Sequence, residues 1–230
     1  METGSPLRHA RLHDFSRVVI VISDAGNFAR CPMPDHVPPP VIVRIAIVAV
    51  FAALALATNY ALIGIPNVKI MDALVFLAAF LFGLKVGVAV GASTWAVYGF
   101  INPQGSADLI LLSFLITGEC FYALAGAGLR KTTIAQDLLE SERFQRGFSL
   151  VFGTVGLLAT LAYDVLTNFA SWLFLTTSPY DALIVGLITG APFALVHEIS
   201  NLVLFSTAAP AAIVAAKRFR LTQLTETSTS

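Results

Sequence analysis

The stretch "MDALVFLAAFLFGLKVGVAVGASTWAVYGFI" (Met71–Ile101) decides how this chain folds. It is one apolar run, interrupted only by "FGLKVG" at Phe82–Gly87. A single helix through the whole run would place the Lys85 ammonium in the hydrocarbon of a bilayer, which is costly. Two short helices joined by a tight turn at Gly83–Lys85 avoid that cost. We therefore predict a helical hairpin here.

The composition of the whole chain is that of a membrane protein. Of its 230 residues 57% are hydrophobic and 12% are charged, and the mean hydropathy is +0.80. Soluble domains carry about 25% charged residues. Apolar runs close to the roughly 20 residues that cross a bilayer recur along the sequence. We predict an all-α bundle of six transmembrane helices, at Val41–Ile63, Met71–Phe82, Val86–Ile101, Ala107–Leu129, Phe148–Leu175 and Ala182–Ala209.

The basic residues predict the orientation of this bundle. With both termini inside, the inner segments are the N-terminal tail, the Lys85 turn, Arg130–Gly147 and the C-terminal tail. They hold every one of the 14 Lys and Arg residues except Lys69. Inner loops of membrane proteins are enriched in Lys and Arg, so the pattern favours six spans with the N- and C-termini in the cytoplasm.

Three regions follow from this topology. Residues 1–40 form a polar tail, 41–216 the six-helix domain, and 217–230 a cytoplasmic C-terminal tail. The tail has no cleavage pattern of a signal peptide. Translation from Met33 would remove most of it, and this alternative stays open. Cys31 lies in the tail and Cys120 within a span, so no disulfide framework is expected.

Small residues recur four apart on three of the predicted spans. Small side chains at this spacing let helix backbones approach closely within a membrane. For the glycines at 83, 87 and 91 and at 186 and 190, packing inside the bundle is the simpler interpretation. The stripe of Ala49, Ala53 and Ala57 on the first span fits either internal packing or contact with a partner protein.

Polar and aromatic residues gather in the outer half of the bundle. Such groups usually face the interior of a membrane protein or a cavity, and often mark function. Asp164, Asn168 and Trp172 form one stripe on the fifth span. The others lie on the third, fourth and sixth spans: Trp95, Tyr98, Asn102, Glu119, Tyr122, His197, Glu198 and Asn201. Their clustering predicts a pocket open to the outside with aromatic walls.

Several of these residues also have a purely structural interpretation. Tyr98 and Trp172 fit an interfacial aromatic belt. Asn168 fits a hydrogen bond between helices, and His197 fits a packed interior residue. The carboxylates of Asp164, Glu119 and Glu198 are harder to explain in this way, because no Lys or Arg shares their predicted depth.

The sequence argues against an enzyme. "HEISN" (His197–Asn201) lacks the second histidine of the H-E-x-x-H zinc motif, and "GAGLRKTT" (Gly126–Thr133) lacks the glycine before the lysine of a phosphate-binding loop. No G-x-S-x-G serine motif occurs. We expect no catalytic residue, no metal and no cofactor, and the formal net charge of zero gives no reason to expect nucleic acid.

The segment "IPNVKIMDALVFLAAFLFGLKVGVAVGASTWAVYGFINP" (Ile65–Pro103), with "YDVLTN" (Tyr163–Asn168), resembles the substrate-binding S components of energy-coupling factor transporters. These are small six-helix vitamin-capture subunits of prokaryotic plasma membranes. The resemblance covers roughly residues 41–216, and its strongest part is the "IPNV…LVFLAAFLFG…VG" block. The polar N-terminal tail departs from the family pattern.

The resemblance implies a set of roles. Ala49, Ala53 and Ala57 would contact a membrane-embedded scaffold subunit, which works with two ATPase subunits. The loop at Gly64–Met71, with Asn67 and Lys69, would cover an outward-facing pocket. The whole subunit would topple in the membrane to release a water-soluble vitamin inside.

The residues also bear on the ligand. Asp164 and Asn168 would hydrogen-bond it, Trp95 and Tyr98 would stack on it, and Glu119, Glu198 and Asn201 would close the floor. Many carboxylates and no basic residue in the pocket favour a neutral or cationic vitamin, such as riboflavin or thiamine, over biotin or folate. Lys69 on the covering loop argues the other way, because it offers a partner to an anion.

Two other classes stay open. A stand-alone membrane carrier or channel would take up its substrate without an ATPase partner. An intramembrane enzyme would form a product from a lipid or peptide, and a purely structural protein would do neither.

Overall fold

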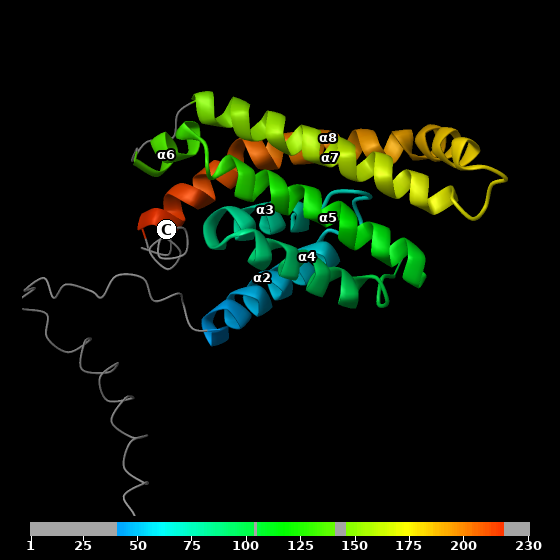
Figure 1. The fold of residues 1–230 in the computed structure, drawn as a ribbon, viewed down its shortest axis with the longest axis horizontal. Coiled ribbons are helices and arrows are strands. Elements are labelled where there is room, and N and C mark those ends of the chain that lie inside the picture. The colour runs from blue at the N-terminus through cyan, green and yellow to red at the C-terminus, as the bar shows by residue number, and fades with distance from the viewer. Residues whose placement is uncertain (1–40, 104, 141–145, 219–230) are drawn as a thin grey trace, which may run out of the picture. The chain divides into compact units, whose positions relative to one another are not determined.

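The computed structural model describes residues 41–103, 105–140 and 146–218 (Figure 1). The chain divides into a unit of residues 1–35 and a unit of residues 36–230, and all described residues belong to the second. The predicted tail at 1–40 therefore lies outside the described residues. Within them the chain forms helices and no strand: α2 (Val41–Ala61), α3 (Met71–Phe82), α4 (Leu84–Tyr98), α5 (Leu109–Leu129), α6 (Thr133–Glu140), α7 (Arg146–Trp172) and α8 (Pro179–Arg218).

Four of these helices are long and apolar enough to cross a membrane: α2, α5, α7 and α8. For the described residues, the prediction of an all-helical chain with helices able to cross a membrane is confirmed. Helix α3 is apolar but has 12 residues, and α4 has 15. The six-span count and the orientation stay predictions. Helix α8 continues through Pro192, Pro210 and the expected domain boundary at Ala216.

The predicted break between the second and third helices is confirmed. Helix α3 ends at Phe82 and α4 begins at Leu84, with Gly83 between them at φ 95°, a value that residues with a side chain rarely adopt. A Cβ on Gly87 would lie 2.5 Å from the Cβ of Ala79, so α4 turns back closely along α3. The two helices form an antiparallel hairpin.

A side chain from α5 satisfies the end of α3. The Nη1 of Arg130 donates hydrogen bonds to the carbonyl oxygens of Phe80 at 3.1 Å and Leu81 at 2.8 Å. The last carbonyls of a helix have no partner inside the helix, so a cation placed there stabilises it.

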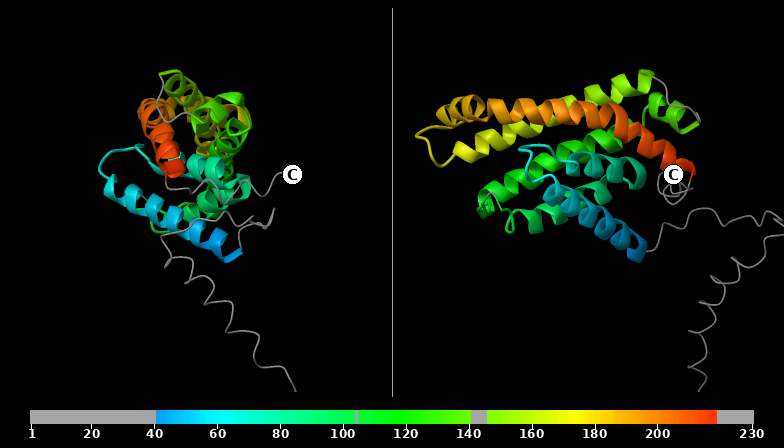
Figure 2. Two further views of the ribbon diagram at one scale, coloured as in Figure 1. Left: turned by 90° about the vertical axis from the view of Figure 1, so that its left-hand side faces the viewer. Right: turned by 180° about the vertical axis from the view of Figure 1, so that it is seen from behind.

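Helix α3 forms the centre of the bundle. All of its residues from Met71 to Leu81 are buried, because the helix is apolar on every side apart from Asp72 and packs against α2, α4, α5 and α8. Figures 1 and 2 show α3 between these neighbours, with α7 and α8 side by side on the side of the bundle away from α2. Phe76 makes edge-to-face contacts with Phe152 of α7 and Phe205 of α8.

Four of the five glycines predicted to pack do so, Gly87, Gly91, Gly186 and Gly190, whereas a Cβ on Gly83 at the turn would meet nothing within 4 Å. Gly153 and Gly156 of α7 leave room for Leu202 and Phe205 of α8, respectively, so the two helices approach closely. Gly186 lies against the backbone of Asn168, and Gly190 lies against its side chain. Asn168 therefore contributes to the packing of α7 on α8.

Candidate functional site

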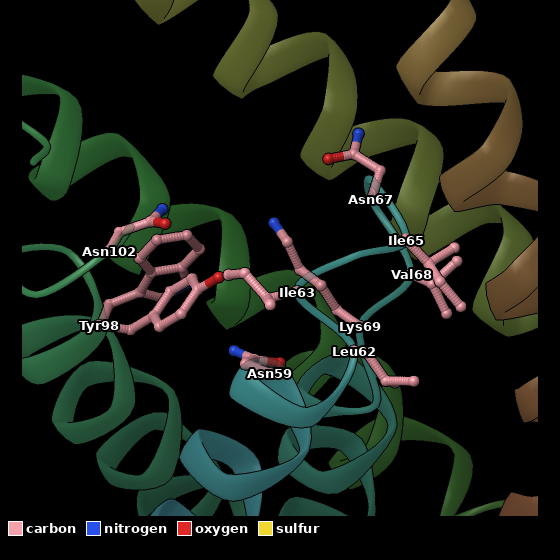
Figure 3. Close-up of a pocket in the computed structure, with 10 residues that line it drawn as sticks. Asn59, Leu62, Ile63, Ile65, Asn67, Val68, Lys69, Tyr98 and Asn102 are labelled. Carbon is pink, nitrogen blue, oxygen red and sulfur yellow. The ribbon is translucent and has the colours of Figure 1, made fainter. Parts of the chain in front are cut away.

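The segment between α2 and α3, residues 62–70, forms one wall of a cavity. Asn67 is in the left-handed backbone region at φ 56°, which asparagine tolerates better than most residues. The cavity has a volume of about 60 Å³. Figure 3 shows its lining residues, which are Asn59, Leu62, Ile63, Ile65, Asn67, Val68, Lys69, Trp95, Tyr98 and Asn102.

Lys69 reaches into this cavity rather than away from it. In Figure 3 its amine points into the space between Tyr98 and Asn67. The Nζ atom lies 5.1 Å from the centre of the Trp95 ring and 5.6 Å from that of Tyr163, both within range of a cation–π interaction. Lys69 is therefore a lining residue of this cavity, and no carboxylate is among the described residues that line it.

The aromatic wall is a chain of edge-to-face contacts. The Trp95 and Tyr98 ring centres are 5.7 Å apart, and those of Tyr98 and Tyr60 are 5.5 Å apart. The indole Nε1 of Trp95 donates a hydrogen bond to Oε1 of Glu119 at 3.0 Å. Glu119 therefore holds the Trp95 ring from α5, although it does not line the cavity.

A second constellation, the polar network, lies within the bundle. It consists of Asp72, Tyr122, Thr160, Asp164, His197 and Asn201, all buried. His197 stands between two carboxylates, with Nε2 2.6 Å from Oδ2 of Asp72 and Nδ1 2.8 Å from Oδ1 of Asp164. Since both ring nitrogens face a carboxylate oxygen, only the doubly protonated imidazolium donates at both contacts. The pairs join α3, α7 and α8.

An amide completes the polar network. The Nδ2 of Asn201 donates to Oδ2 of Asp72 at 2.8 Å and to Oγ1 of Thr160 at 2.9 Å. The hydroxyl of Tyr122 donates to the same Thr160 oxygen at 3.2 Å. These bonds offset part of the large cost of burying charged and polar groups.

Several buried polar atoms among the described residues have no hydrogen-bond partner. They are Oδ1 of Asn59, Asp72 and Asn201, Oδ2 of Asp164, Oε2 of Glu119, both carboxylate oxygens of Glu198 and the hydroxyl of Tyr163. Apart from the Tyr163 hydroxyl, which can also donate, these atoms are acceptor oxygens of amides and carboxylates. Buried polar groups are rarely left in this state.

The predicted site residues separate into distinct places. Asn67, Lys69, Trp95, Tyr98 and Asn102 line the cavity. Tyr122, Asp164, His197 and Asn201 belong to the polar network, and Glu119 touches the cavity wall through Trp95. Asn168, Trp172 and Glu198 line neither, so the structure does not place the Asp164–Asn168–Trp172 stripe along this cavity.

The sequence analysis missed Asp72, which is fully buried and pairs with His197. The available signal was a carboxylate in an apolar segment, the same signal that singled out Asp164. It also missed Tyr163 and Thr160, because an aromatic or a threonine in an apolar helix is most often a packing residue. Among the described residues no group of three or more His, Cys, Asp or Glu is placed to hold a metal ion.

Comparison with known proteins gives no relative from which residue roles transfer. No protein-family model, curated protein or solved structure matches the chain. The chemistry of the site therefore rests on the geometry described above.

Proposed function

We propose that this protein is the substrate-binding S component of an energy-coupling factor importer for a water-soluble vitamin. The observation that carries the proposal is the cavity between the α2–α3 segment and the aromatic wall of α4. Amide side chains, an amine and two rings converge there. A few convergent polar groups among aromatic side chains are typical of small-molecule sites.

The size of the cavity indicates how such a site would work. A volume of about 60 Å³ is far below the roughly 300–1,000 Å³ of sites that enclose a drug-sized ligand. A vitamin would therefore enter only when residues 62–70 move away from Trp95 and Tyr98. This segment has the exposed Ile65 and Pro66 at its outer side, so its movement would disturb little of the buried core.

The partner side of the proposal concerns the α2 surface. Ala49, Ala53 and Ala57 are all exposed, next to the exposed apolar side chains of Val50 and Leu54. Only 11% of the apolar stretch of α2 that is long enough to cross a membrane is buried inside the bundle. A flat alanine stripe suits close approach by another transmembrane helix, and we assign it to the scaffold subunit.

The ligand half of the proposal is tested by native mass spectrometry. The protein is purified in mild detergent from a host grown with vitamins, and the spectrum is searched for a bound small mass. A bound vitamin supports the proposal. A protein that stays empty after titration with a panel of water-soluble vitamins refutes vitamin capture.

The partner half needs a separate experiment. We expect Ala53→Leu to abolish copurification with a coexpressed scaffold–ATPase module, because the larger side chain separates the helices. Ala96→Leu is the matched control, since Ala96 is equally exposed but lies on α4. Equal copurification of both variants would exclude the α2 stripe as the contact, and uptake without any ATPase module would indicate a stand-alone carrier.

A further inference from the structure

The surroundings of Lys69 have the character of a cation site. Its ammonium lies over the rings of Trp95 and Tyr163, at 5.1 and 5.6 Å from their centres. Two ring faces around a positive charge are a recurring arrangement for binding organic ammonium groups. Here the charge comes from the chain itself, on the segment that covers the cavity.

Two acidic side chains lie within electrostatic range of the same ammonium, although neither lines the cavity. Lys69 interacts electrostatically with the carboxylates of Asp72 and Glu119. One oxygen of each, Oδ1 of Asp72 and Oε2 of Glu119, is buried without a hydrogen-bond partner, and so is the hydroxyl of Tyr163. We call Lys69, Asp72, Trp95, Glu119 and Tyr163 the cation cage.

The cage cannot dispense with its positive charge at low cost. Without Lys69, His197 alone would have to balance the buried carboxylates of Asp72 and Asp164, with which it makes its two contacts. Uncompensated charge in a buried site costs several kcal/mol. A molecule that displaces Lys69 must therefore bring a positive charge of its own.

The same geometry argues against an anionic ligand. The unpartnered oxygens of Asp72 and Glu119 can only accept hydrogen bonds from a ligand as carboxylates, and an anion beside Lys69 would bring further acceptors within electrostatic range of both. Lys69 already interacts favourably with Asp72 and with the two rings. An anion would have to bind against them rather than with them.

We infer that the cavity takes a small organic cation, and that Lys69 is a stand-in for it which the ligand displaces as residues 62–70 move away. This inference rests on the proposed function and narrows its ligand to the cationic class. The ammonium of Lys69 and the cation of the ligand compete for the same two ring faces. Lys69 thus keeps the empty cavity small. A ligand binds only if its cation competes successfully with the Lys69 ammonium for the two rings.

The test uses tetramethylammonium chloride as the probe and the fluorescence of Trp95 as the readout. The wild-type protein and Lys69→Met are titrated in detergent, with tert-butyl alcohol as a neutral probe of similar shape and sodium chloride as the ionic control. We expect Lys69→Met to bind tetramethylammonium about tenfold more tightly, because the competing ammonium is gone. Lys69→Arg keeps a cation and should bind like the wild type.

Two tryptophan variants assign the signal. The response should disappear in Trp95→Phe and persist in Trp172→Phe, because Trp172 does not line the cavity. If Lys69→Met does not elute as a single species, Lys69→Gln carries the same comparison with a neutral polar side chain.

The inference is overturned if Lys69→Met binds tetramethylammonium no more tightly than the wild type, or if tert-butyl alcohol binds as well as the cation. It is also overturned if inorganic phosphate binds the wild type but not Lys69→Met, since Lys69 would then be an anion receptor. None of these titrations involves a scaffold or an ATPase. A protein that binds tetramethylammonium as expected but captures no vitamin and recruits no scaffold would keep this inference and refute the proposed function alone.

Discussion

Replacement of His197 by leucine tests whether the polar network holds the bundle together. His197 is 1% exposed and stands between Asp72, which is 0% exposed, and Asp164, which is 5% exposed. His197→Leu fills a similar volume but removes both contacts, at 2.6 and 2.8 Å, in one step. Two carboxylates are then left in the interior without their cation.

Two estimates of the cost differ enough for a measurement to separate them. If the contacts acted as ordinary hydrogen bonds between transmembrane helices, the loss would be about 0.6 kcal/mol each. Breaking a buried ion pair from one side instead costs about 3–5 kcal/mol, because the remaining charge is uncompensated. We expect the larger value, which corresponds to a fall in melting temperature of roughly 6–12 °C for about 3 kcal/mol in a chain of this size.

The assay is thermal unfolding in detergent, followed by circular dichroism at fixed protein and detergent concentrations. Glu198→Gln is the matched control on the same helix, because neither carboxylate oxygen of Glu198 has a hydrogen-bond partner. The triple variant His197→Leu, Asp72→Asn, Asp164→Asn removes the uncompensated charges and should recover part of the loss. A His197→Leu protein that melts within 2 °C of Glu198→Gln (about the shift expected from 1 kcal/mol or less) would refute the reasoning, as would a triple variant less stable than His197→Leu.

Two further predictions concern backbone positions. Gly126→Ala should destabilise the protein by about 1–3 kcal/mol, because the new Cβ would overlap the carbonyl oxygen of Phe76 on α3. Gly128→Ala on the same helix is the control: its Cβ would meet nothing within 4 Å, so it should be neutral or slightly stabilising, and equal melting temperatures of the two variants would contradict the prediction. Asn67→Val should cost about 1–2 kcal/mol because of its φ of 56°, and Asn67→Gly should not, as measured by the same thermal unfolding; a stable Asn67→Val variant would show that the segment adopts another conformation.

Features of the fold that depend on local chemistry were predictable. The break at Gly83 followed from one charged residue and one glycine in an apolar run, because a lysine is excluded from hydrocarbon and a glycine permits the turn. The helix α6 at Thr133–Glu140 was not predicted, since its apolar residues are too few to stand out from a polar loop. The exposure of Ala49, Ala53 and Ala57 was also left open, because small residues face partners and interiors alike.

The candidate site was predictable only in its residue types. Trp95, Tyr98 and Lys69 were singled out, but their mutual arrangement was not, because the side of a loop to which Lys69 turns depends on the backbone path of residues 62–70. Asp164 and Asn168 share one helix face, and the sequence placed both in one pocket. In the fold they have different neighbours: Asp164 meets His197, and Asn168 fills the space above Gly190.

The sequence by itself determined that this protein is helical, that some of its helices are long and apolar enough to cross a membrane, and where its apolar helices break, because hydropathy and backbone preference act over a few neighbouring residues. Only the tertiary structure decided which charges meet. Asp72 and His197 are 125 residues apart along the chain, yet they form the 2.6 Å contact at the centre of the bundle. Such pairing depends on how α3 and α8 pack, and that is set by the shapes of all the side chains between them.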